Sequence, residues 1–178
     1  MAGRDEYVII GLNGTGRTLA AMLALSQNNK ILLVDDDTVS ETVFEQGYTK
    51  IDVGLLKGEA VRDAIKEINS KAIDNIKVMS EPIEASLEEL EAKIGNLVVF
   101  CCKPYSNKTR AHIAKTLNNA AQHVYFCSYD DRGNYEILIC ADGGKDFSAV
   151  YDLPNSKENP NQYQAAATEL FVTHMNKQ

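Results

Sequence analysis

The feature that most constrains this chain is an unbroken strand–turn–helix–strand pattern over residues 6–34. An apolar strand expected over 6–11 runs into the glycine-rich turn of residues 11–16, and a helix over 14–26 leads to a second apolar strand at 30–34. This order is typical of a βαβ unit that binds a nucleotide, because glycines let backbone N–H groups approach a phosphate at the positive end of a helix. The pattern predicts a Rossmann-like sheet.

The turn departs from the usual G-x-G-x-x-G motif. Its glycines are Gly11, Gly14 and Gly16, and Asn13 stands where the second glycine would be. Asparagine tolerates a left-handed backbone better than most residues, so we expect the turn to form. Arg17 follows where a smaller residue would leave more room for a diphosphate. A tight strand-to-helix turn without a ligand is the alternative interpretation.

Strands and helices continue to alternate along the rest of the chain. The further strands are expected over 76–79, 97–102, 123–127 and 135–140. The further helices are expected over 54–69, 87–94 (capped by Ser86), 107–121 and 163–175. Residues 130–134 indicate a hairpin. We therefore expect an α/β, mainly parallel sheet with helices on both faces and an antiparallel hairpin at its C-terminal end.

Composition and charge limit the classes of function. The 178 residues are expected to form a nucleotide-binding domain over 1–145 and a C-terminal extension with a helix over 146–178. The net charge of −7, with no basic stripe, disfavours nucleic acid as a partner. No apolar run reaches the length of about 20 residues that spans a bilayer, and the first residues show no signal peptide. We expect a cytoplasmic protein without a membrane partner.

The four cysteines are Cys101, Cys102, Cys127 and Cys140, all in apolar runs. None shows the C-x-x-C spacing of a zinc site. We expect buried, reduced thiols. The alternative is a reactive thiol, for which Cys102 is the best candidate because it lies where a strand gives way to a loop.

The segment after the second strand carries motifs more specific than the general nucleotide-binding βαβ pattern. It contains Asp35-Asp-Asp-Thr-Val39, then Gln46, then Gly54-Leu-Leu-Lys57, and Asn69 where the next helix is expected to end. Over roughly residues 6–140 the chain resembles the ThiF/MoeB/ubiquitin-activating E1 family. That family combines a glycine-rich turn, an Asp-x-Asp-x-Val strand end, an Arg-Gln pair and a Gly-x-x-Lys helix start.

The resemblance implies a site for ATP and Mg²⁺, at which members of this family adenylate the C-terminal carboxylate of a ubiquitin-like protein. By this resemblance the glycines line the phosphates, Asp35 binds the ribose, Asp37 is the second acid of its motif, and Lys57 contacts a phosphate. A cation beside a triphosphate favours charge on the leaving group. The candidate nucleotide-binding residues are therefore Gly11, Asn13, Gly14, Gly16, Asp35, Asp37 and Lys57.

Two positions depart from the family pattern. The arginine of the Arg-Gln pair corresponds to Glu45, and the acid that helps to hold Mg²⁺ after the fourth strand corresponds to Lys103. Magnesium requires carboxylate oxygens, and a lysine supplies none. We therefore assign no metal ligand, no zinc and no catalytic residue.

These observations favour a degenerate member of the family, which acts mainly as a nucleotide-binding or partner-binding and assembly module. The alternative is an active ATP-dependent adenylyltransferase of a ubiquitin-like protein's C-terminus. A third hypothesis, an NAD-binding sensor or oxidoreductase, rests on the βαβ unit alone. The resemblance also implies a ubiquitin-like or other protein partner and a homo-oligomer.

Overall fold

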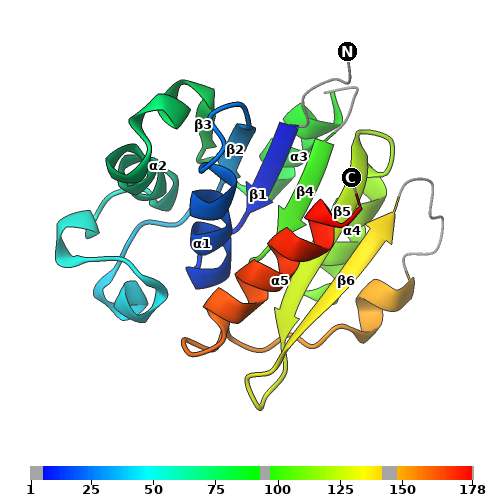
Figure 1. The fold of residues 1–178 in the computed structure, drawn as a ribbon. Helices are drawn as coiled ribbons and strands as arrows, with labels where there is room; N and C mark the ends of the chain where they lie inside the picture. Colours follow the sequence, from blue (N-terminus) through cyan, green and yellow to red (C-terminus); the bar gives the residue numbers. More distant parts are fainter. Residues whose placement is uncertain (1–5, 93–96, 142–147, 178) are drawn as a thin grey trace.

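A computed structural model describes residues 6–92, 97–141 and 148–177. Six strands form one sheet in the order β3-β2-β1-β4-β5-β6 (Figure 1). Their bounds are β1 (Glu6–Ile10), β2 (Lys30–Val34), β3 (Ile76–Met79), β4 (Leu97–Cys101), β5 (Ala121–Tyr129) and β6 (Tyr135–Ala141). Neighbouring strands are parallel except for the antiparallel pair of β5 and β6. The predicted mainly parallel sheet with a terminal hairpin is confirmed.

Helices cover both faces of the sheet. The α-helices are α1 (Gly14–Leu23), α2 (Lys57–Ile68), α3 (Ile83–Glu91), α4 (Asn107–Leu117) and α5 (Tyr163–Met175). Short 3-10 helices are η1 (Glu41–Gln46), η2 (Lys50–Asp52), η3 (Ser70–Asn75) and η4 (Ser148–Asp152). Apolar side chains of α1, α2 and α5 pack on one face, and those of α3 and α4 pack on the other.

The central strands are buried on both faces, which is why the runs 7–10 of β1, 31–34 of β2 and 97–101 of β4 are apolar throughout. Along β1, Tyr7 and Ile9 enter the core under α1, α2 and α5, whereas Val8 and Ile10 enter the core above α3 and α4. Successive side chains of a strand point to opposite faces, so two cores demand a continuous apolar run. The sheet therefore holds the ends of β1, β2 and β4 rigidly.

Helix α5 packs on the sheet and on α1 of the same chain (Figure 1). Ala166 and Leu170 are fully buried, and the buried His174 ring stands edge-on to Tyr7 at 5.5 Å between ring centroids. Phe100 makes a similar edge contact at 5.9 Å. The predicted helix over 163–175 is thus confirmed, and its sparse apolar positions are those that face the core.

Several predicted helix boundaries were wrong. Ser86 does not cap a helix but lies inside α3, which begins after Pro82, and its Oγ donates to the Glu81 carbonyl at 3.2 Å. Helix α2 begins at Lys57 rather than residue 54, because Gly54 adopts a left-handed backbone with φ +88°. Helices α1 and α4 end at Leu23 and Leu117, earlier than expected. The sequence Asp142-Gly-Gly144 also predicts a turn, but these residues lie outside the described ones.

The Rossmann-like arrangement brings the carboxyl ends of the parallel strands to one edge of the sheet, where ligands of such folds bind. Within the described residues, no helix combines the length and hydrophobicity needed to traverse a bilayer. The division into domains at residue 145 stays a prediction.

Candidate functional site

The glycine turn between β1 and α1 is tightly packed against the backbone around it. Gly11 has φ +89°, and a Cβ on it would lie 2.5 Å from the backbone nitrogen of Lys103. A Cβ on Gly16 would lie 1.9 Å from the Gly11 carbonyl oxygen. Asn13 is extended, with φ −69° and ψ −172°, so the left-handed backbone considered for it is not needed. The turn therefore depends on glycine at 11 and 16.

A carboxylate of the same chain occupies the start of α1. The backbone nitrogens of Gly14 and Thr15 donate to Glu158 Oε2 and Oε1, each at 2.7 Å, and the Thr15 hydroxyl also donates to Oε1. The Tyr129 hydroxyl lies 2.7 Å from Thr15 Oγ1. Backbone N–H groups at a helix N-terminus are donors to anions, and here they hold an acid 144 residues away in the chain.

Asp35 is buried at the end of β2 and holds the turn in place. Its side chain is 3% exposed. Oδ2 accepts from the Leu12 backbone nitrogen at 2.6 Å, and Oδ1 accepts from the Asp37 backbone nitrogen at 2.9 Å. Both oxygens already bind backbone donors, so a ribose hydroxyl would have to share or displace them.

Lys57 joins the glycine turn to the aspartate segment. Its side chain is 4% exposed. The ammonium donates to Asn13 Oδ1 at 2.9 Å and to Asp37 Oδ2 at 3.3 Å. The structure thus brings Asn13, Asp37 and Lys57 together at one edge of the sheet, as the resemblance implied.

Lys103 places a second ammonium among the aspartates. Nζ lies 2.8 Å from Asp36 Oδ1, 3.2 Å from Asp37 Oδ2 and 3.7 Å from Asp35 Oδ1. The three carboxylates could offer ligand atoms within 4.8 Å of one another. The Lys103 ammonium pairs with all three carboxylates and offsets part of their charge, so the cluster does not fit Mg²⁺, which requires unshared carboxylate oxygens.

Charge and burial shift the pKa values of these groups. Burial alone would raise the pKa of Asp37, but the ammoniums of Lys103 and Lys57 outweigh it and hold that pKa below 3.8. Burial would likewise lower the pKa of Lys103, but Asp36, Asp35 and Asp37 raise it above 10.5. Lys103 therefore stays charged at neutral pH.

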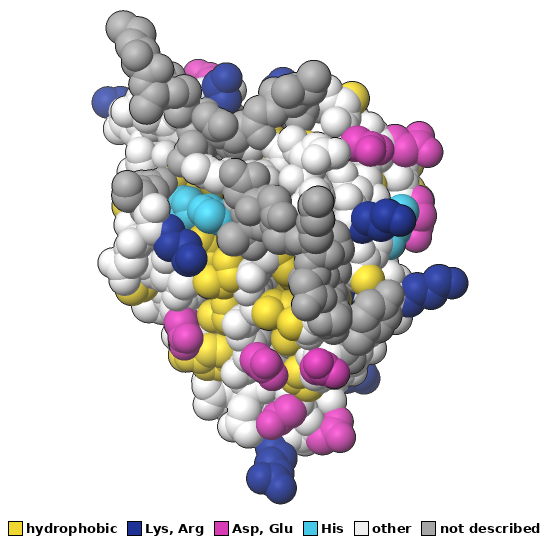
Figure 2. Space-filling model, turned by 90° about the vertical axis from the view of Figure 1, so that its right-hand side faces the viewer, with side chains coloured by type: hydrophobic (Ala, Val, Ile, Leu, Met, Phe, Trp, Pro, Cys, Tyr) yellow, Lys and Arg dark blue, Asp and Glu magenta, His cyan; other side chains and the backbone are white. Residues whose placement is uncertain are grey.

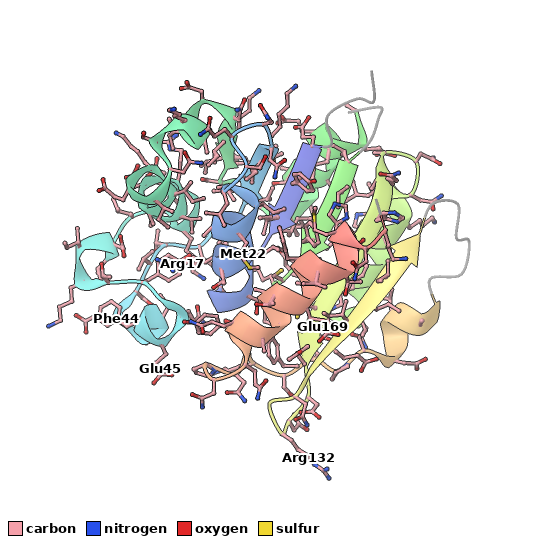
Figure 3. All side chains as sticks on the ribbon, viewed as in Figure 1. Arg17, Met22, Phe44, Glu45, Arg132 and Glu169 are labelled. Atoms are coloured by element: carbon pink, nitrogen blue, oxygen red, sulfur yellow. The ribbon has the colours of Figure 1, made fainter. Side chains whose placement is uncertain are left out.

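A cavity of about 210 Å³ lies beside the glycine turn, bounded by η1, Asn13 and the segment around Glu158. Glu45, which lies on η1 (Figure 3), and Gln46 both line it. Gln46 Oε1 is buried, and no donor from the described residues reaches it. The walls carry two acids, Glu45 and Glu158, against one base, Lys157.

Arg17 is not among the residues that line this cavity. Its guanidinium carbon lies 5.5 Å from the centre of the Tyr48 ring, and a Cβ on Gly47 would lie 2.7 Å from Arg17 Nη1. Arg17 therefore reaches from α1 toward the segment after η1 (Figure 3) and does not cover the start of the helix, which Glu158 occupies. The crowding expected of this residue does not arise.

The thiols are buried or half-buried and free. Burial raises the pKa of Cys101 and of Cys127 to about 12, and that of Cys102 well above 9.0. Thiols rather than thiolates are therefore present at neutral pH, and the thiol form is unreactive. The arrangement favours the buried, reduced interpretation over a reactive Cys102.

The seven candidate residues gather at one edge of the sheet, but nucleotide binding by them stays a prediction. Sequence reasoning missed Glu158, which lies in a polar segment rich in proline and asparagine. No local pattern distinguishes this glutamate from its exposed neighbours, because its partners are fixed only by the tertiary fold.

Comparison with known proteins identifies the family of this chain and solved structures with a similar fold. The ThiF family model matches residues 3–133. No curated protein matches the chain. Similar solved structures include E. coli MccB with AMPCPP and MccA (TM-score 0.76, 16% identity, covering 96% of this chain and 54% of that one). PaaA has a TM-score of 0.70 and 20% identity, covering 97% of this chain and 55% of that one.

A third similar structure is the E. coli tRNA N6-threonylcarbamoyladenosine dehydratase TcdA in complex with AMP (TM-score 0.53, 20% identity), covering 64% of this chain and 46% of that one. This chain spans about half the length of the solved structures that it matches. At these identities the likenesses show the fold.

Proposed function

This chain belongs to the ThiF family, and we propose that it is a nucleotide-binding or partner-binding module of that family rather than an adenylating enzyme. The observation that supports this proposal is the position of Lys103, whose Nζ lies 2.8 Å from Asp36 and 3.2 Å from Asp37. A metal-dependent adenylylation would need those carboxylates for Mg²⁺. Here both are paired with the Lys103 ammonium instead.

Glu45 supports the same proposal. It lines the cavity beside the glycine turn where the family pattern has an arginine. A carboxylate at that position repels phosphate oxygens and stabilises none of the charge that develops during phosphoryl chemistry. Both departures lower the expected activity while leaving the fold intact.

The decisive measurement is ATP–pyrophosphate exchange in the presence of Mg²⁺ and a candidate protein with a ubiquitin-like C-terminus. We expect no exchange above background. Calorimetric titration with ATP, with and without EDTA, should give the same affinity in both conditions. Mg²⁺-dependent exchange would contradict the proposal, and tight NAD binding without ATP binding would favour the oxidoreductase hypothesis instead.

Lys103→Ala tests the metal argument directly. Removing the ammonium leaves three neighbouring carboxylates, so we expect Mg²⁺ to raise the Tm of this variant. The exposed Lys108 on α4 provides a matched control, and Lys108→Ala should behave like the unaltered chain, whose Tm should not respond to Mg²⁺. An increase in the Tm of the unaltered chain with Mg²⁺ would show that the site binds Mg²⁺ despite Lys103.

An active adenylyltransferase is the second candidate. The N–H groups at the start of α1 and the buried Lys57 favour it, since both suit a triphosphate. Similar solved structures were obtained with AMPCPP and with ATP. The exchange assay described above separates the two candidates.

A protein or peptide partner is part of the proposal. MccB was solved together with MccA, which supports a similar kind of partner for this chain. The partner we propose is one that presents a C-terminal carboxylate. A pull-down with ubiquitin-like candidates, compared with the same candidates lacking their last residues, tests this requirement.

We also propose a homo-oligomer. β6 is an edge strand, and no strand of the described residues pairs with its outer side. Ile137, Leu138 and Ile139 are only half-buried, and hydrophobic side chains gather on this face (Figure 2). Such an edge is a template for pairing with a second chain. Light scattering over a range of concentrations would contradict this if only the monomer mass appeared.

A further inference from the structure

The segment of residues 153–162, here called the strap, crosses the edge of the sheet where the parallel strands end. It connects η4 to α5 and passes the glycine turn (Figure 1). Glu158, near its middle, supplies the carboxylate that the start of α1 holds. The strap therefore covers the place where a phosphate would bind.

The start of α1 binds the Glu158 carboxylate in the way that a helix N-terminus binds an anion. Two backbone nitrogens, those of Gly14 and Thr15, and one hydroxyl donate to its two oxygens. The helix that they begin is ten residues long, and its partial positive charge adds to the attraction. The same donors would serve the oxygens of a phosphate, and they are saturated while Glu158 is bound.

The strap is anchored by hydrogen bonds on both sides of Glu158. Before it, Arg110 Nη1 donates to the Pro154 carbonyl at 2.9 Å, and the Ser156 nitrogen donates to the Tyr129 carbonyl at 2.8 Å. After it, Asn159 Nδ2 donates to the Gly133 carbonyl at 3.1 Å. These hydrogen bonds hold Glu158 at the start of α1, and hydrogen bonds can break and re-form.

Little apolar surface holds the strap. Leu153 is its buried apolar residue, whereas α5 beyond it is secured by Ala166, Ala167 and Leu170. Segments with few buried apolar contacts open locally at low cost while the core stays folded. The cavity of about 210 Å³ beside Glu158 also offers space next to the α1 donors. The strap can thus leave the helix while α5 remains docked.

We propose that Glu158 is an internal competitor that closes the α1 anion site, and that a phosphate group of a ligand must displace it to bind. This inference rests on the proposed function, because it takes the start of α1 to be a phosphate site. The apparent affinity for such a ligand is then the intrinsic affinity reduced by the fraction of molecules with the strap open. Removing the Glu158 carboxylate removes the competition.

The test uses Glu158→Ala and Glu158→Gln, with ATP and inorganic pyrophosphate as separate probes in the absence of Mg²⁺. We expect Glu158→Ala to bind both probes at least about tenfold more tightly than the unaltered chain. Glu158→Gln, which keeps the shape but loses the charge, should also gain affinity. Glu89→Ala, at an exposed glutamate of α3, controls for the change in net charge and should gain none.

Hydrogen exchange provides a readout that needs no ligand. In Glu158→Ala we expect faster exchange at the Gly14 and Thr15 amides and in the strap, with unchanged protection in β1 and β4. Unchanged exchange at Gly14 and Thr15 would overturn the contact itself. Retained protection in the two strands excludes unfolding as the cause.

The outcomes separate this inference from the proposed function. Equal ATP affinity of the unaltered chain and Glu158→Ala would overturn the competition while leaving nucleotide binding intact. Tighter pyrophosphate binding by Glu158→Ala without any ATP binding would support the competition and contradict the nucleotide function. Absence of binding by either probe to either variant would overturn the competition.

Discussion

Lys57 Nζ lies 2.9 Å from Asn13 Oδ1, so the first residue of α2 is bonded to the last residue before α1. This contact spans 44 residues of sequence, and its Lys57 end is buried while Asn13 is half-buried. It ties the glycine turn of the βαβ unit to the start of α2 through side chains rather than through the sheet. The lysine that the resemblance assigned to a phosphate thus also has a structural role.

Lys57→Ala should therefore destabilise the chain even without a ligand. Losing the ammonium leaves Asn13 and Asp37 without this donor, and we expect a decrease of about 1–3 kcal/mol in the free energy of unfolding. Urea unfolding followed by circular dichroism measures this. Lys66→Ala, at an exposed lysine of the same helix, is the control and should stay within about 0.5 kcal/mol.

Gly16→Ala and Gly54→Ala should differ in severity for different physical reasons. A Cβ on Gly16 would meet the Gly11 carbonyl oxygen at 1.9 Å, and backbone cannot move aside, so we expect a loss of about 3 kcal/mol or more. A Cβ on Gly54 would meet nothing within 4 Å. There only the left-handed backbone is strained, which costs about 1–2 kcal/mol.

Thermal or urea unfolding of the two variants side by side measures this difference. Equal losses would mean that the turn can open to accept a methyl group. The close packing of the glycine turn would then be wrong.

Cysteine labelling should follow burial. At about pH 8, iodoacetamide should modify Cys140 first, because it is half-buried while Cys101, Cys102 and Cys127 are buried. Burial raises the pKa of all four thiols, so the difference in exposure decides the order. All four should react in denaturant. Mass spectrometry of peptides from the native chain checks this, and rapid modification of Cys102 would restore the reactive-thiol interpretation.

Asp37 should make stability depend on pH in the acid range. Its pKa in the folded chain lies below the ordinary 3.8, so its contribution to stability is complete above that value and is lost as the pH falls through the folded pKa. We expect the free energy of unfolding to fall less steeply between about pH 4 and 2 in Asp37→Asn than in the unaltered chain. Identical slopes would exclude Asp37 as a source of acid sensitivity.

The sheet could be predicted from sequence because each strand is an apolar run between turn residues. The strands at 30–34 and 76–79 matched residue for residue, and so did the helix over 163–175. The starts of α1, α4 and α5 also matched, whereas those of α2 and α3 did not, because one local signal competed with another there. Helix α3 begins directly after Pro82, before the Ser86 that the capping pattern indicated. Helix α2 begins three residues later than predicted, at Lys57, because Gly54 has a left-handed backbone.

The site could be predicted only in part. Sequence identified Lys103 as a departure from the family pattern, but its ion pairs with three aspartates follow from the approach of β4 to β2 across β1. Glu158 could not be found, because nothing near it in sequence encodes a partner at Gly14. Residues that are far apart in sequence and meet only in the folded chain leave no local sequence pattern.

The packing of α5 on α1 has a consequence for how the chain is made. The last helix, Tyr163–Met175, covers one of the first, Gly14–Leu23, so this part of the core stays open until synthesis has passed residue 175. At ribosomal speeds of about 5–20 residues per second, the wait is roughly 10–30 s. During that time the nascent chain exposes an apolar helix face and is a natural client for chaperones.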